Sequence, residues 1–195
     1  MMGRHAETAD FFQRALTLDE SNHSAWSNLG STRHFLGRYA EAARALEKAV
    51  GLAPDRHLYR GNLGDAYRRL EGRQHQAVKA YENGIRLVRE RLSAAPDDGL
   101  RSSLAVYLAK SGDKAAALAE LAQVDHVQAK DSRVLFKAAP VYEFAGDRLK
   151  ALTAVKRAIR AGYSRHEIVS EPDWAALRSD PRYARIADST AAARN

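Results

Sequence analysis

The chain has 195 residues, no cysteine, five prolines and 8% aromatic residues, which excludes disulfides and thiolate metal sites and suits an all-helical protein. Its formal net charge of +7 at pH 7 favours acidic partners through long-range attraction. No run of about 18 apolar residues occurs and the N-terminus lacks an apolar signal core, so we expect a cytoplasmic protein without a membrane span.

Residues 1–22 form one predicted helix. Its apolar face is marked by Ala9, Phe12, Ala15 and Leu18. The stretch Gly3–Glu7 resembles the turn between two helices together with the start of the second, so we interpret the segment as the second helix of an incomplete N-terminal repeat. Because such a helix lacks its partner, we expect Phe11 or Phe12 to be exposed. That exposure predicts either a fragment of a longer protein or a homodimer formed through this helix.

Residues 23–56 contain two helix-length segments separated by a turn at Gly37. Large and small side chains follow in the order Trp26, Leu29, Gly30, Ala42, Leu46, Ala49 and Pro54. Spacings of three and four place Trp26, Leu29 and Arg33 on one helical face of the first segment, and place Ala42, Leu46 and Ala49 on one face of the second. Gly30 and Ala42 are small where two helices must approach closely, and Trp26 and Leu46 fill the wider space beside them. The pattern predicts an antiparallel helix pair.

The same order recurs in three further stretches, residues 57–97, 98–131 and 132–163. Their first segments carry the pairs Leu63-Gly64, Leu104-Ala105 and Ala138-Ala139. The four copies start at residues 23, 57, 98 and 132, so successive starts are 34, 41 and 34 residues apart. The longer interval comes from Glu71 in a turn and from Val88–Ala95, which we expect to lengthen the second helix until Pro96 ends it.

Trp-x2-Leu-Gly, followed by Ala-x3-large-x2-Ala and a closing proline, resembles the tetratricopeptide repeat (TPR), whose period is 34 residues. Arg33 departs from the family at a position where tyrosine is preferred. The resemblance implies an all-α fold, a right-handed superhelical solenoid of antiparallel helix pairs. It also implies that the first helix of each pair lines a concave groove.

Helix ends carry their own signals. We expect side-chain caps from Asn22 or its neighbours Asp19 and Ser21, from Asp55, from Asp97 or Asp98, and from Asp131 or Ser132. Gly112-Asp113 and Gly146-Asp147 predict short turns in which glycine ends one helix and aspartate caps the next. Pro140 lies in mid-helix, where its missing amide hydrogen predicts a kink or a 3₁₀ distortion.

Residues 164–195 depart from the period and predict a short C-terminal helical cap and tail. Proline stands in the first turn of two short predicted helices, after Glu171 and after Asp180. We expect the apolar face of the last repeat to be covered by Trp174, Leu177, Tyr183 and Ile186. The tail Thr190–Asn195 is expected to fray.

Residues 57–186 also resemble the C-terminal TPR region of bacterial receptor-like serine/threonine kinases and related signalling proteins. The residues that carry this likeness are Leu104–Asp113, Val141–Gly146, Ala161–Tyr163 and Leu177–Tyr183. The resemblance implies that the chain is the regulatory arm of a larger signalling protein. The chain itself contains no glycine-rich kinase loop, His-Arg-Asp or Asp-Phe-Gly motif.

Positions on the first helices that are not packing anchors are candidates for a peptide-binding groove. They are Asn28, Ser31, Phe35, Asn62, Asp65, Arg69, Ser103, Lys110, Arg133, Phe136 and Lys137. Asn28 and Asn62 stand one repeat apart, so their amides could hold the backbone of a peptide, or could merely solvate their helices. Arg69, Lys110 and Lys137 could attract carboxylates, which predicts a protein or peptide partner of acidic character.

No residues form a reactive constellation. The seven histidines lack metal-ligand spacing, and no nucleophile turn such as Gly-x-Ser-x-Gly occurs, so we predict neither an enzyme nor a metal or cofactor site. The leading hypothesis is a non-catalytic protein–protein interaction scaffold. The alternative, a helical-repeat RNA-binding module, follows from the basic charge. Nucleic acid is the weaker prediction, because no basic block of five or six residues occurs.

Overall fold

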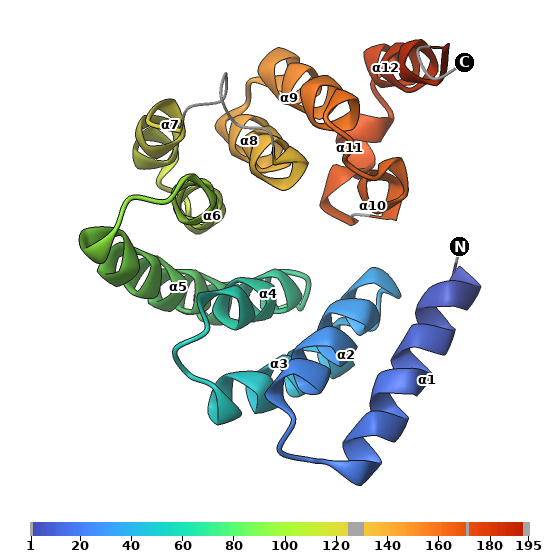
Figure 1. Ribbon diagram of the computed structural model, residues 1–195, viewed down its shortest axis with the longest axis vertical. Helices are drawn as coiled ribbons and strands as arrows, with labels where there is room; N and C mark the ends of the chain where they lie inside the picture. The colour runs from blue at the N-terminus through green and yellow to red at the C-terminus, as the bar shows by residue number, and fades with distance from the viewer. Residues whose placement is uncertain (1, 125–130, 171, 193–195) are drawn as a thin grey trace. The chain divides into compact units, whose positions relative to one another are not determined.

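The computed structural model describes residues 2–124, 131–170 and 172–192, and within these ranges it is helical with no strand (Figure 1). The all-α prediction is therefore confirmed. The chain divides into two compact units, residues 1–87 and 88–195, which are described separately.

Unit 1 contains four complete helices and the first part of a fifth. These are α1 (Met2–Leu18), α2 (His23–Phe35), α3 (Tyr39–Leu52), α4 (His57–Arg68) and α5 (Gln74–Ala94). Helices α2 and α4 begin at the residues where the first two predicted copies start. Helix α5 is longer than α3, as expected from the extra residues before Pro96, and its last part belongs to unit 2.

Unit 2 continues with α6 (Asp98–Ser111), α7 (Lys114–Ala122), α8 (Ser132–Ala145) and α9 (Arg148–Arg160). Its C-terminal part consists of α10 (Arg165–Ser170), the 3₁₀ turn η1 (Pro172–Trp174), α11 (Ala175–Arg178) and α12 (Pro181–Ala192). Helices α6 and α8 again begin where the predicted copies start. The tail that is expected to fray begins at Thr190. Its residues 190–192 form the end of α12, and residues 193–195 lie outside the described ranges.

In the hairpins of unit 1, a glycine of the first helix packs against a bulky side chain of the second helix. A Cβ atom added to Gly30 of α2 would lie 2.5 Å from Leu46 Cγ of α3. A Cβ atom added to Gly64 of α4 would lie 2.5 Å from Tyr81 Cε1 of α5. Both Leu46 and Tyr81 are fully buried. The small residue therefore sets how closely the two helices of each pair approach, as the sequence predicts for Gly30.

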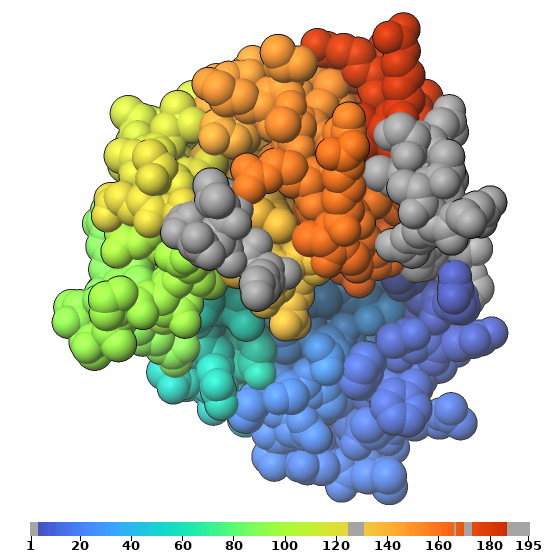
Figure 2. All heavy atoms as spheres, turned by 45° about the horizontal axis from the view of Figure 1, so that its top comes forward, coloured from blue at the N-terminus to red at the C-terminus, as the bar shows by residue number. Residues whose placement is uncertain are grey.

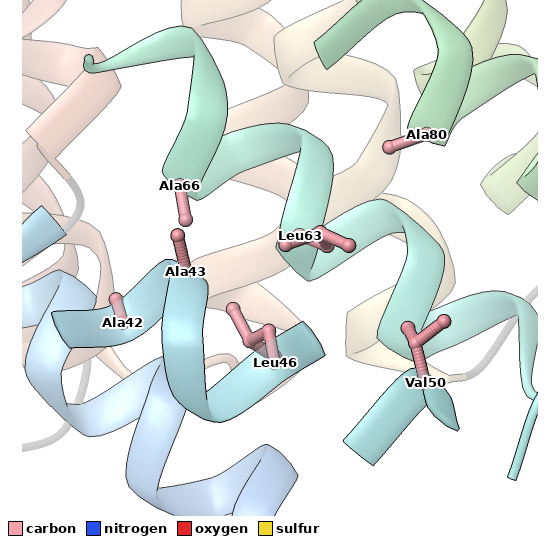
Figure 3. Close-up of a cluster of buried hydrophobic side chains, with 7 residues drawn as sticks. All are labelled: Ala42, Ala43, Leu46, Val50, Leu63, Ala66 and Ala80. Atoms are coloured by element: carbon pink, nitrogen blue, oxygen red, sulfur yellow. The ribbon is translucent and has the colours of Figure 1, made fainter. Parts of the chain in front are cut away.

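A cluster of apolar side chains joins the first complete hairpin to the second. It consists of Ala42, Ala43, Leu46, Val50, Leu63, Ala66 and Ala80 (Figure 3). Ala43 of α3 points toward Ala66 of α4 in Figure 3, and both are buried. Small methyl side chains at this seam allow the two backbones to approach, and the neighbouring hairpins share one apolar core.

Helix α1 packs on α2 through Ala9 and Leu16. Two predictions for this segment are wrong. The turn expected at the start of residues 3–7 is absent, because all of them lie inside the helix. Leu18 is exposed because the buried face follows the 3.6-residue period from Ala9 to Leu16. The expected exposure of an aromatic side chain is confirmed at Phe11, which is 60% exposed. The outer face of α1 (blue) lies at the surface in Figure 2.

Most predicted caps are confirmed. A side-chain oxygen accepts a hydrogen bond from a first-turn amide at Asn22, Asp97, Asp113, Asp131 and Asp147. Gly112 and Gly146 end their helices with φ of 106° and 92°. The prediction for Asp55 is wrong, because α4 begins at His57 and the cap position falls on Arg56, whose side chain makes no cap bond.

Pro140 does not interrupt α8, so the predicted 3₁₀ distortion is wrong. The helix is α-helical from Ser132 to Ala145. Apolar side chains on both sides of the proline are buried, among them Ala139 and Val141. This packing holds the helix through a position where one backbone hydrogen bond is missing.

Two glycine substitutions test the small-to-large contact. Gly64→Ala gains helix propensity but drives a methyl group into the buried Tyr81 ring, and we expect it to lower the free energy of unfolding by about 1–3 kcal/mol. Gly51→Ala in α3 is the matched control, since nothing lies within 4 Å of its Cβ position, and should stabilise by up to about 1 kcal/mol. Urea unfolding measures both. A stabilising Gly64→Ala would contradict the role of this contact.

Candidate functional site

The predicted asparagine pair of unit 1 occupies two different environments. Asn28 of α2 is exposed to solvent. Asn62 of α4 is half-buried, and its Nδ2 donates a hydrogen bond of 3.1 Å to Ser31 Oγ of α2. The amide of Asn62 and the hydroxyl of Ser31 therefore tie α4 to α2, while the Asn28 amide faces solvent.

Asp65 of α4 binds the second helix of its own hairpin. Tyr81 Oη donates a hydrogen bond of 2.7 Å to Asp65 Oδ1. Burial of the Tyr81 ring, with the Asp65 carboxylate second, raises the pKa of Tyr81 well above its usual value. The carboxylate thus satisfies a buried hydroxyl and helps to hold the ring against Gly64.

The remaining predicted residues of unit 1 contact aromatic or imidazole rings. The guanidinium carbon of Arg69 lies 5.9 Å from the ring centroid of Tyr39, a cation–π geometry. Phe35 stacks on His5 of α1, with ring centroids 5.5 Å apart. Arg69 is partly exposed, whereas Phe35 is partly covered by α1.

In unit 2, Lys137 of α8 points into the contact with α6. Its Nζ donates to Gly99 O at 3.1 Å and to Ser103 Oγ at 2.8 Å. Burial lowers the pKa of Lys137. Ser103 is only 3% exposed, so the prediction that it lines an open groove is wrong. Its hydroxyl is enclosed between two first helices.

Two further predicted residues of unit 2 contact the C-terminal part of the chain. Phe136 of α8 stacks on Tyr163 and on Trp174, with centroid distances of 4.0 Å and 4.7 Å. Lys110 Nζ of α6 lies 3.9 Å from Asp173 Oδ2. Part of the predicted surface is therefore covered by the chain itself. The repeat pattern predicts a cap on the last repeat, which contains Phe136. It does not predict the contact with Lys110, which lies in the third repeat.

Arg133 remains exposed at the start of α8, where its Nε lies 3.5 Å from Asp131 Oδ1. The predicted cap is confirmed at Trp174, Leu177 and Ile186, which are all buried. Tyr183 is half-buried. Trp174 stacks on Phe136 of α8 and helix α12 packs on α9, so both parts of the C-terminal segment contact the last hairpin.

A pocket that sequence reasoning missed lies between α8 and α9. It is lined by Leu135, Ala138, Tyr142, Lys150, Thr153, Ala154 and Arg157. Lys150 Nζ pairs with Asp147 at 2.8 Å and lies 5.7 Å from the Tyr142 ring centroid. The apolar members occupy hairpin-packing positions, so their spacing predicts a filled contact and gives no sign of a hollow.

Within the described ranges, no three histidine, aspartate or glutamate side chains gather in a way that could hold a metal ion. None of the helices described has both the length and the hydropathy needed to cross a bilayer.

Substitution of Lys137 tests its buried setting. Lys137→Met keeps the apolar stem and removes a desolvated charge together with its hydrogen bonds, so the free energy of unfolding should change by less than about 1 kcal/mol. Lys137→Glu places a carboxylate against the Gly99 carbonyl and should cost about 2–4 kcal/mol. Arg133→Glu on the exposed start of α8 is the control and should be near neutral. Equal tolerance of both Lys137 variants would show that the ammonium lies in solvent.

Alkaline titration tests the environment of Tyr67. Burial first, and a hydrogen bond to Glu47 second, raise the pKa of Tyr67 from 10.0 to about 12. The folded state therefore holds this proton more tightly than the unfolded state, and the stability it contributes falls as pH rises from 10 to 12. Urea unfolding across this window should show a shallower decline for Tyr67→Phe. An unchanged slope would contradict the assignment.

Comparison with solved structures shows the fold. TTC0263, a thermophilic TPR protein of Thermus thermophilus, is 21% identical, with a TM-score of 0.61 over 94% of this chain and 91% of that protein. YrrB, described as a TPR protein with an unusual peptide-binding site, is 23% identical, with a TM-score of 0.44 over 86% of this chain and 82% of that chain. MamA is 19% identical, with a TM-score of 0.46 over 87% of this chain and 93% of that chain.

Sequence comparison gives the family. No curated protein matches the chain, but the family model of the bacterial transcriptional activator domain matches residues 4–106, which is more than half of the sequence. The matched residues include the TPR-like hairpins of unit 1 and end within α6. The chain therefore belongs to the bacterial transcriptional activator domain family.

Proposed function

We propose that this protein is a non-catalytic scaffold that binds a peptide segment of a partner protein on its first helices. The observation that carries the proposal is the polar face of α2 and α4. It presents the exposed side chain of Asn28 and, directly after α4, the partly exposed residue Arg69, with Asn62 held in place by Ser31. Polar groups on rigid, mutually braced helices are suited to recognise a peptide without reorganising.

The chemistry of unit 1 favours an acidic segment. The guanidinium carbon of Arg69 lies 5.9 Å from the ring centroid of Tyr39, so this face carries a cation whose planar group suits a carboxylate. The formal charge of +7 adds a long-range attraction for acidic partners. Asn28 complements this by offering both a donor and an acceptor to a peptide backbone.

Family membership suggests a biological setting for the scaffold. We place the partner among the proteins of bacterial transcription, in keeping with the description of the family. A regulatory arm of a larger signalling protein, which the distal resemblance predicts, is compatible with the same scaffold role. The first proposal concerns the partner and the second the larger protein to which the chain would belong, and both leave the proposed mode of binding unchanged.

Charge reversal tests the assignment to unit 1. Peptides selected on the intact chain from a displayed library should be enriched in acidic residues. Arg69→Glu should weaken their binding about tenfold or more, as measured by fluorescence anisotropy, because a bidentate carboxylate contact becomes a repulsion. Arg44→Glu is the matched control, since Arg44 is exposed on the second helix of the first complete hairpin, and should change binding by less than about twofold.

Equal effects of the two reversals would refute the α2–α4 face as the site. An RNA oligonucleotide that bound more tightly than any selected peptide, with an affinity falling steeply with salt, would instead favour the RNA-binding alternative.

A further inference from the structure

The short segment Pro172–Arg178, here called the return segment, consists of η1 and α11. It lies beside α8 and α9 in Figure 1 and contacts both of them. A segment that served only to cover the last hairpin would need no contacts beyond α8 and α9. The return segment reaches further, because Asp173 Oδ2 lies 3.9 Å from Lys110 Nζ of α6. The side chains of Lys110 and Asp173 are only 12% and 6% exposed.

Trp174, the residue after Asp173, completes an aromatic stack. The rings of Phe136 and Trp174 are inclined by 21°, and those of Phe136 and Tyr163 by 9°. Near-parallel rings at these centroid distances, with Trp174 buried, make a specific contact beyond burial of apolar area. A carboxylate and an aromatic ring on consecutive residues thus meet a lysine and an aromatic ring on two first helices.

The backbone of the return segment is also bound. Arg148 Nη1 at the start of α9 donates a hydrogen bond of 2.8 Å to the carbonyl oxygen of Ala176. Side-chain donors that bind a main-chain carbonyl are what a surface needs to hold an extended or turned peptide. The segment is therefore held as a ligand would be, by one charge, one ring and one main-chain group.

We propose that the face formed by Lys110 of α6 and Phe136 of α8 is a binding site for a partner segment in which an acidic residue directly precedes an aromatic one. The chain's own Asp173-Trp174 fills this site until such a partner displaces it. The proposal rests on the proposed scaffold function and specifies its ligand in unit 2. Because the return segment is tethered, it competes at an effective concentration on the order of millimolar, so a free peptide binds only weakly unless the segment is loosened.

Displacement can be followed through Trp174 itself. The sequence contains two tryptophans, so Trp26→Phe leaves Trp174 as the reporter. The probe is a synthetic peptide with the sequence of residues 171–178 in which phenylalanine replaces tryptophan. Its addition at millimolar concentration should shift Trp174 emission to the red and increase acrylamide quenching in a saturable manner. A peptide that carries lysine in place of the aspartate is the control and should cause no change.

A second measurement does not depend on the reporter variant. Asp173→Ala removes the carboxylate of the return segment and leaves its tryptophan in place. The fluorescein-labelled tryptophan form of the probe should bind this variant at least about tenfold more tightly than the wild-type chain, and adding Lys110→Met should abolish the gain. Circular dichroism confirms that each variant is folded. No emission change together with equal affinities for wild type and Asp173→Ala would overturn the proposal.

The two proposals fail separately. If peptides that depend on Arg69 bind unit 1 while the probe neither displaces Trp174 nor prefers Asp173→Ala, only the site in unit 2 is refuted. If the probe behaves as expected while Arg69→Glu and Arg44→Glu act alike, the α2–α4 assignment is refuted and the site in unit 2 stands.

Discussion

The structure depends on the close contact between a small residue of one helix and a bulky side chain of the next. In unit 1, Leu46 packs against Gly30 and the Tyr81 ring packs against Gly64. Each side chain lies so close that a Cβ atom on the glycine would clash with it. The contact sets the separation of the two helices in each hairpin, and the alanines of α3 and α4 then set the separation between hairpins. Because packing occupies these faces, the proposed recognition uses the other side of the first helices.

That remaining side is itself partly used for structure. Asn62 and Lys137 each stand five residues after the first residue of their helices, and each donates a hydrogen bond to the preceding first helix. One position of the repeat therefore links neighbouring hairpins in both units, with an amide in one case and an ammonium in the other. Residues predicted to meet a partner instead brace the surface that would meet it.

A periodic sequence predicts the features of this fold that depend on local spacing. Spacing of three and four residues and recurrence near 34 are local properties, and they suffice for the hairpins and the starts of the first helices. The setting of Lys137 depends on Gly99 and Ser103 in another repeat, and that of Lys110 on Asp173 beyond the last one. No periodicity encodes these pairs, because they arise only when helices distant in sequence are brought together.

The end of unit 2 joins stability to recognition. A stack of hairpins needs a cover over its last apolar face, and the C-terminal part of the chain provides one, with α12 on α9 and Trp174 on Phe136 of α8. The return segment within this part places Asp173 and Trp174 on α6 and α8, so residues that help to close the end also occupy the proposed ligand site. A partner at that surface gains only the difference between its own contacts and those it replaces. Its affinity is therefore set as much by how firmly the return segment is held as by the surface beneath it.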